Sequence, residues 1–157
     1  MSDLSLPTTD LDALSRTIDG EADGEPVLGR EAIAAVVGNR LAIARAWCKE
    51  HGAPRHPVFG EPTWCGVCLA SWRDVYQFSC WEEGSADRRR ILEFPPSPSI
   101  VEIAREAIAG RLIDPTGGAT QYLNVALERQ LYGHLPGWIS GMEMTRQIGH
   151  HTFYRPR

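Results

Sequence analysis

A glutamate on the apolar face of the first predicted helix is the feature that most constrains how this chain can fold. Apolar residues recur at helical spacing over residues 9–22, with Thr9 or Asp10 available as the N-cap. Glu21 follows Leu14 by seven residues, which places both side chains on one face. A glycine and a proline then end the helix within the next turn. The fold must therefore accommodate a carboxyl group among apolar side chains at the C-terminal end of a helix.

Two physical effects at Glu21 favour its protonated form. Apolar neighbours remove water from the carboxyl group, and the C-terminal end of a helix carries a negative partial charge. Both effects raise the pKa of Glu21. A carboxylic acid that stays protonated near neutral pH can donate a proton to the oxygen of a glycosidic bond. The sequence therefore indicates Glu21 as the catalytic acid of a glycoside-cleaving site.

Glu25 lies one turn after Glu21, and two hypotheses for it stay open. Two carboxylates about 5–5.5 Å apart would allow a retaining double displacement, with Glu25 as the nucleophile. Glu25 precedes Pro26, however, and a residue before proline disfavours helical geometry. We therefore expect Glu25 to be a hydrogen-bonding group, toward the substrate or within the structure, with the nucleophile as the alternative.

Five short motifs follow one another along the chain: GEADGEP from Gly20, AIAAVVGNR from Ala32, QFSCW from Gln77, DPTGGAT from Asp114 and IGHHTFY from Ile148. Together they resemble the SleB-type cell wall hydrolases, the spore-cortex-lytic enzyme family, over residues 15–154. The resemblance implies a lysozyme-like fold, cleavage of peptidoglycan glycan strands and a single essential glutamate, which corresponds to Glu21. The chain departs from the pattern at Gln121, where an aromatic residue or histidine often follows GGAT, and in the extended segment 47–75.

A single glutamate is sufficient for glycan cleavage. Glu21 can donate its proton to the bond oxygen and then remove the proton of the sugar's own 6-hydroxyl as that oxygen attacks the anomeric carbon. This reaction would make the protein a lytic transglycosylase, whereas attack by water would make it a muramidase. The resemblance favours the transglycosylase. The alternatives are a peptidoglycan amidase or peptidase, for which no HExxH motif is present, and a non-catalytic wall-binding or virion module.

The remaining pattern predicts an α+β fold that is mostly helical, with a small C-terminal antiparallel sheet. Further helices are predicted over 29–50 and 85–92 and from a cap at Ser99 to Gly110, and strands over 119–124, 143–147 and 150–154, with a turn at Ile148–Gly149. The segment 68–78 is compatible with a short helix or with extended chain. We expect one domain over residues 1–157, with 1–8 flexible.

Polar groups alternate along the strand that follows the Gly117–Gly118 turn. One face of this strand would carry a hydroxyl, an aromatic ring and an amide, which suit a sugar with N-acetyl substituents. Adjacent glycines also allow a ligand to approach the backbone closely. The predicted substrate-binding residues are Glu25, Gln77, Ser79, Thr116, Gly117, Thr120, Tyr122 and Asn124.

Four cysteines lie in the irregular part of the sequence. We expect two disulfides, Cys68–Cys80 and Cys48–Cys65; a structural zinc site formed by the same four residues is the alternative. His150 and His151 are adjacent in a predicted strand and point to opposite faces, so they do not suit one metal ion. We expect His151 in the core, His150 exposed, and no catalytic metal or cofactor.

Composition limits the partners and the location. With 43% hydrophobic and 23% charged residues the chain reads as a globular domain, and no apolar run approaches the roughly 20 residues of a membrane span. The net charge of −4 argues against nucleic acid as a partner. The polar, acidic start MSDLSLPTTD lacks the pattern of a Sec signal peptide. We expect a monomer that acts on peptidoglycan in the periplasm or cell wall after release by lysis, on a particle, or by non-Sec export.

Overall fold

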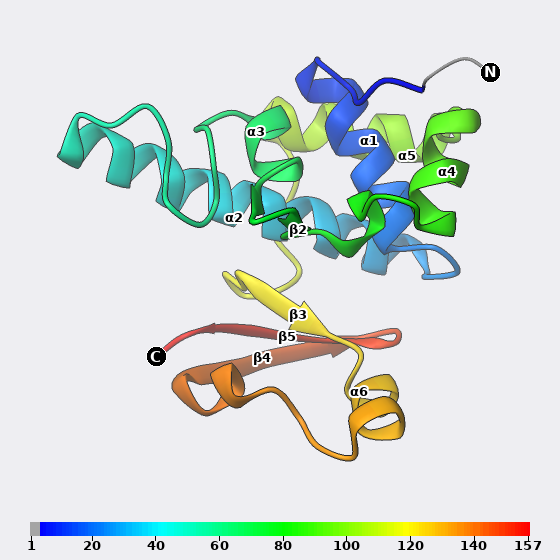
Figure 1. Cartoon of the computed structure of the whole chain (residues 1–157), viewed down its shortest axis with the longest axis vertical. Helices are drawn as coiled ribbons and strands as arrows, with labels where there is room; N and C mark the ends of the chain where they lie inside the picture. Colours follow the sequence, from blue (N-terminus) through cyan, green and yellow to red (C-terminus); the bar gives the residue numbers. More distant parts are fainter. Residues whose placement is uncertain (1–3) are drawn as a thin grey trace.

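A helical body formed by the N-terminal part of the chain packs on a small antiparallel sheet formed by the C-terminal part (Figure 1). The computed structural model describes residues 4–157. The helices are α1 (Asp10–Glu21), α2 (Val27–His51), α3 (Trp64–Cys68), α4 (Ala86–Glu93), α5 (Pro98–Ile108) and α6 (Val125–Tyr132), with short 3-10 turns η1 (Ser79–Trp81) and η2 (Gly137–Gly141). The strands are β1 (Ser71–Trp72), β2 (Val75–Tyr76), β3 (Gln121–Leu123), β4 (Met142–Ile148) and β5 (His151–Pro156). The α+β prediction, with a small C-terminal sheet, is confirmed.

The first helix has the boundaries and the buried face that its spacing predicts. Thr9 is its N-cap, and the Thr9 Oγ1 atom accepts a hydrogen bond from the Asp12 backbone N–H at 3.2 Å. Leu14 and Ile18 are fully buried, and α1 packs against α3 and α5. Helix α2 ends at Gly52, whose left-handed conformation (φ 59°) closes the helix.

The core is formed mainly by α1, α2 and α5, and the segment after β2 adds its largest side chains. Trp81 and Phe78 are fully buried, and the Trp81 indole N–H donates to Thr17 Oγ1 at 2.9 Å. Gly20 is required in α1 because a Cβ atom there would lie 2.6 Å from the Cβ of Cys80. This close approach brings η1 against the end of α1, where Glu21 is located.

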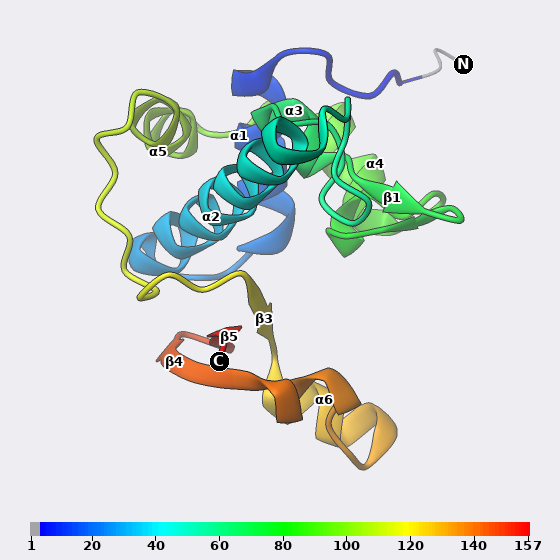
Figure 2. The same ribbon diagram turned by 90° about the vertical axis from the view of Figure 1, so that its left-hand side faces the viewer.

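The C-terminal sheet has the strand order β3-β5-β4, with both pairings antiparallel. In Figure 2 the sheet forms a separate layer, and β3 is the strand that leads into it from the helical body. Tyr122 on β3 pairs with Phe153 on β5. The β4–β5 turn lies at Gly149–His150, one residue later than predicted, because Ile148 still pairs with His151.

Two features of the helices differ from the sequence predictions. Helix α5 has its cap at Ser97 rather than Ser99, because Pro98 takes the first helical position, where its fixed φ and missing N–H are tolerated. Helix α6 and η2 were not predicted. None of the residues of α6 is buried, so the apolar pattern that identifies a helix with a buried face is weak here.

The N-terminal segment is partly packed on the body. Leu6 contacts the core cluster and Pro7 is buried, while residues 1–3 of the predicted flexible segment 1–8 lie outside the described residues. No helix within residues 4–157 is long and apolar enough to cross a membrane.

All four cysteines carry free thiols in this structure, which corrects the expectation of disulfides Cys68–Cys80 and Cys48–Cys65. The fold gives the four thiols separate surroundings. Cys48 lies near the end of α2, and the Cys65 thiol donates to the Pro7 carbonyl oxygen at 3.6 Å. Cys68 and Cys80 are buried in the core, where burial raises the pKa of the Cys68 thiol to about 12. The alternative zinc site is not formed either, since no three His, Cys, Asp or Glu side chains of residues 4–157 are grouped to hold a metal ion.

Candidate active site

Glu21 lies at the last residue of α1 and faces the sheet layer. Its carboxyl group has two hydrogen-bonding partners, the Tyr122 hydroxyl from β3 and the Ser79 backbone N–H from η1. Burial is the largest influence and raises the pKa of Glu21 from 4.5 to about 7. The sequence prediction of a raised pKa at this residue agrees with this value. At neutral pH both the protonated and the charged form of Glu21 are therefore populated.

Tyr122 connects the sheet to Glu21. Its ring meets the His151 ring edge-on at a centroid distance of 4.9 Å and the Phe153 ring at 5.7 Å. The hydroxyl donates to Glu21, and burial raises the pKa of Tyr122 well above 10, so the phenol stays protonated. The strand face that the sequence assigns to Tyr122 thus faces Glu21. His151 is largely buried beside Tyr122 and His150 is exposed, as expected.

Arg40 of α2 completes the surroundings of Glu21, and the sequence reasoning missed it. It is only 3% exposed, and its charge acts on both Glu21 and Tyr122. The sequence does indicate that Arg40 is buried, because it lies four residues after Val36 and four before Ala44, on the buried face of α2. A charged residue on that face needs hydrogen-bond acceptors inside the fold.

A cavity of about 580 Å³ opens between the helical body and the sheet layer. It contains two of the predicted substrate-binding residues, Gln77 and Thr120, beside aromatic and apolar side chains. The residues that line it are Ile43, Phe59, Gln77, Thr120, Gln121, Trp138, Met142 and Pro156. Arg40 donates to the Thr120 carbonyl oxygen at 2.7 Å and to Gln121 Oε1 at 3.1 Å, and so links this cavity to the surroundings of Glu21.

The Glu25 side chain binds the β4–β5 turn. Its side chain is buried and accepts hydrogen bonds from the His150 backbone N–H at 3.2 Å and the His150 ring at 3.1 Å. The His151 ring nitrogen Nδ1 lies 3.8 Å from the same carboxylate. Of the hypotheses for Glu25, the structure favours the structural hydrogen-bonding group, because this carboxylate anchors the β4–β5 turn.

Three further predicted site residues have structural partners. The Thr116 hydroxyl is buried and donates to Asp114 Oδ1 at 2.6 Å, while Gly117 continues the same turn at φ 70°. Asn124 is the N-cap of α6, and its Oδ1 accepts from the Leu127 N–H at 3.0 Å. These side chains organise the chain on either side of β3. They make no contact with Glu21 among the interactions of the described residues.

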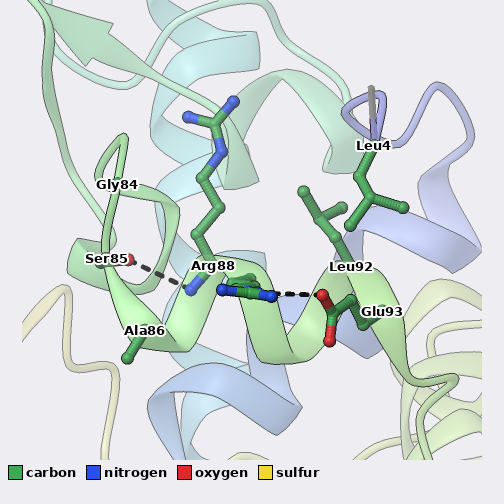
Figure 3. Close-up of a pocket in the computed structure, with 8 residues that line it drawn as sticks. Leu4, Gly84, Ser85, Ala86, Arg88, Leu92 and Glu93 are labelled. Carbon is green, nitrogen blue, oxygen red and sulfur yellow. Dashed lines mark hydrogen bonds and ion pairs between the residues drawn. The ribbon is translucent and has the colours of Figure 1, made fainter. Parts of the chain in front are cut away.

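A second cavity, of about 630 Å³, lies along α4 (Figure 3). Its polar groups are already bonded to one another within the helix: Ser85 Oγ accepts from the Arg88 N–H at 3.1 Å, and Arg89 pairs with Glu93 at 2.9 Å. None of the predicted site residues lines it. The candidate active site is therefore the region of Glu21, Tyr122 and Arg40.

Comparison with known proteins agrees with this arrangement. Residues 24–154 match the family model described as Cell Wall Hydrolase. The chain belongs to the cell wall hydrolase family. The matched part begins at Gly24, so Glu21 lies just before it.

Three named proteins are similar to most of the chain. The chain is 27% identical over 144 residues to a spore cortex-lytic enzyme of Halalkalibacterium halodurans, covering 92% of this chain but 34% of that protein. It therefore spans about a third of the length of this curated relative. The structure is similar to the catalytic domain of the germination-specific lytic transglycosylase SleB from Bacillus anthracis (TM-score 0.63, 25% identity), covering 98% of this chain and all of that domain. The SleB catalytic domain of Bacillus cereus shares the fold, with a TM-score of 0.60 and 24% identity over 96% of this chain and 95% of that domain.

Proposed function

We propose that this cell wall hydrolase is a lytic transglycosylase that cleaves the glycan strands of peptidoglycan, with Glu21 as both acid and base. The observation that carries the proposal is the pKa of Glu21, which burial raises to about 7. A group with this pKa can donate a proton and accept one back at neutral pH. The names of the similar spore cortex-lytic enzyme and of the similar lytic transglycosylase support the substrate and the reaction.

The reaction consists of two proton transfers through one carboxyl group. Protonated Glu21 donates its proton to the oxygen of the glycosidic bond, the bond from C1 to this oxygen breaks, and the leaving sugar departs with a hydroxyl group. The Glu21 carboxylate then takes the proton of the 6-hydroxyl of the remaining sugar, and the 6-oxygen forms a bond to C1. The product is a 1,6-anhydro sugar, no water is consumed, and Glu21 is protonated again.

A double displacement is not part of this proposal, because Glu25 is already engaged. Its carboxylate accepts hydrogen bonds from the His150 backbone and ring on the β4–β5 turn. A nucleophile has to be free to attack the anomeric carbon. The proton donor and acceptor are thus one residue, and the mechanism requires no metal or cofactor.

The cavity between the helical body and the sheet layer supplies a surface for the glycan. The exposed Trp138 offers a ring of the kind on which sugars stack, and Gln77 offers an amide for the N-acetyl groups. Tyr122 and the Ser79 N–H hold the Glu21 carboxyl group. We place Gln77, Ser79, Thr120 and Tyr122 along the bound glycan, and we propose that the protein acts as a monomer at the cell wall.

The test is the mass of the products from purified sacculi. A lytic transglycosylase releases fragments with anhydro ends, which are lighter by one water than the reducing ends left by a muramidase. Freed stem peptides would instead indicate an amidase or peptidase. Anhydro ends that accumulate with the wild-type protein support the proposal, whereas reducing ends or free peptides as the main product refute it.

A further inference from the structure

Arg40 is a buried cation without an ion-pair partner in the part of the chain that the structure describes. Its side chain is 3% exposed, and none of the ion pairs within residues 4–157 includes it. Removing an unpaired charge from water costs several kcal/mol, which folded proteins normally compensate with an opposite charge. The fold therefore holds this cation in place at an energetic cost.

Neutral groups account for only part of the hydrogen bonding of Arg40. Nε donates to the Thr120 carbonyl oxygen and Nη2 donates to Gln121 Oε1, while Nη1 is buried and has no partner. The guanidinium lies 4.7 Å from the centre of the Phe78 ring and 5.4 Å from that of Phe59. Two rings and two hydrogen bonds thus fix the position of the charge.

The charged group that changes state next to Arg40 is Glu21. The other titratable groups that act on Glu21 are Tyr122 from β3, Cys80 from η1 and Asp87 from α4. Tyr122 and Cys80 stay neutral, since burial raises the pKa of both side chains, and Asp87 carries a negative charge that opposes ionisation of Glu21. Among the groups of residues 4–157 that act on Glu21, Arg40 is the cation, and its charge favours the Glu21 carboxylate.

We propose that Arg40 is a positioning residue, the fixed counter-charge that stabilises the Glu21 carboxylate between its two proton transfers and holds β3 at the two residues before Tyr122. The proposal rests on the function proposed above. During each turnover Glu21 gives up its proton inside the protein, where an uncompensated anion is costly. The same guanidinium fixes Thr120 and Gln121, so that the strand that carries the Tyr122 hydroxyl keeps its distance from Glu21.

The direct test follows the two side chains by NMR in the absence of substrate. In the wild-type protein we expect the Arg40 Nε–H resonance to shift with the same midpoint as the ¹³C resonance of the Glu21 carboxyl group, and the Arg40 shift to disappear in Glu21→Gln. Arg40→Met should raise the pH midpoint of the Glu21 titration. Arg40→Lys keeps the positive charge, so its midpoint should lie close to that of the wild type. If the Arg40 resonance does not shift over the pH range in which Glu21 titrates, the inference is overturned. This comparison is made on the wild-type protein, so it does not depend on whether a variant of Arg40 folds.

The second readout is the pH profile of sacculus lysis. Since Glu21 must be protonated to begin the reaction, we expect Arg40→Met to lower the maximal rate by roughly 100-fold and to move the alkaline limb to higher pH. A merely structural role would lower the rate and leave the limb in place, which would overturn the inference. The matched control is Arg89→Met, the same change at an exposed side chain of α4, which should alter neither rate nor limb.

Failure of the proposed function is distinguishable from failure of this inference. If the wild-type protein releases no anhydro ends while Glu21 and Arg40 titrate together, the reaction is wrongly assigned and the pairing stands. If anhydro ends form while Arg40 is insensitive to Glu21, the reaction stands and the role of Arg40 is refuted.

Discussion

Gly149 lies directly against the Glu25 carboxylate, so closely that no side-chain carbon fits at residue 149. This contact joins the loop after α1 to the β4–β5 turn, where His150, the neighbour of Gly149, donates to Glu25 across 125 positions of the chain. Gly149 also adopts φ 57°, a left-handed conformation that other residues rarely take. The helical body and the sheet are therefore fastened together next to the candidate active site.

Gly149→Ala should destabilise the protein. The added carbon must displace Glu25 and break its hydrogen bonds to His150, at a cost of about 3 kcal/mol or more of the free energy of unfolding. Thermal or urea unfolding measures the effect. Gly141→Ala is the control, since a carbon added at Gly141 meets nothing within 4 Å. Equal stability of the two variants would contradict the close contact.

Glu21→Gln should fold normally and lose sacculus-lysing activity. The amide keeps the size and hydrogen bonding of the side chain but has no proton to transfer, and acid–base catalysis contributes about 10²–10⁴-fold to the rate. The release of soluble fragments from sacculi measures the loss. Glu50→Gln makes the same change at an exposed residue near the end of α2 and should retain the parent rate. More than a tenth of the activity left in Glu21→Gln would exclude this residue as the acid.

The stability of the protein should depend on pH through Glu21. Its pKa is raised from 4.5 to about 7 in the folded state, so folding favours the protonated form. The stabilisation is complete below pH 4.5 and is lost as the pH rises through 7. Relative to Glu21→Gln, which does not titrate, the wild type should lose about 3 kcal/mol between these limits. Urea unfolding of both proteins at pH 4.5 and pH 8 measures the difference, and parallel pH dependences would be the contrary result.

Tyr122→Phe should change the pH profile while preserving the ring contacts. The hydroxyl hydrogen bond lowers the pKa of Glu21, so its removal raises this pKa and moves the alkaline limb of lysis to higher pH. The contacts of the ring with His151 and Phe153 remain, so the melting temperature should change little. Tyr132→Phe, at an exposed residue of α6, is the control. An unmoved limb in Tyr122→Phe would show that the hydroxyl does not act on Glu21.

The four cysteines should be accessible to alkylation once the protein is denatured without reductant. Free thiols at Cys48, Cys65, Cys68 and Cys80 would each gain one alkyl group, which mass spectrometry counts directly. Reductant should leave the melting temperature unchanged, and EDTA should leave lysis unchanged because the proposed reaction involves no metal. Two alkyl groups instead of four would indicate a disulfide.

Local sequence patterns predicted the parts of the site that depend on residues close to one another in the sequence. Helical spacing placed Glu21 on the apolar face of α1, and alternation after the glycine turn placed Tyr122 on the face that meets it. The capping role of Asn124 was not predicted, because a polar residue at the end of a strand can equally cap the next helix and α6 buries no side chain that would have revealed it.

The interactions that could not be predicted are those that join distant segments. The pairing of Glu25 with His150 depends on how the loop after α1 meets the β4–β5 turn, and no local pattern contains that information. Arg40 donates hydrogen bonds to Thr120 and Gln121, which lie about 80 residues later in the chain. For Arg40 the local pattern indicates burial, but its partners follow only from the assembled fold.

The strand order β3-β5-β4 has a consequence for the timing of activity during synthesis. The central strand β5 is made after both of its neighbours, and β3 pairs with no other strand of the described residues. Until β5 leaves the ribosome, the strand that carries Tyr122 has no neighbouring strand and relies on its hydrogen bonds to Asn39 and Arg40 of α2. Pairings between distant segments also form late in folding, because closing a long loop costs entropy first. The surroundings of Glu21 are therefore complete only after residues 151–156, the last strand to be made, have paired with β3.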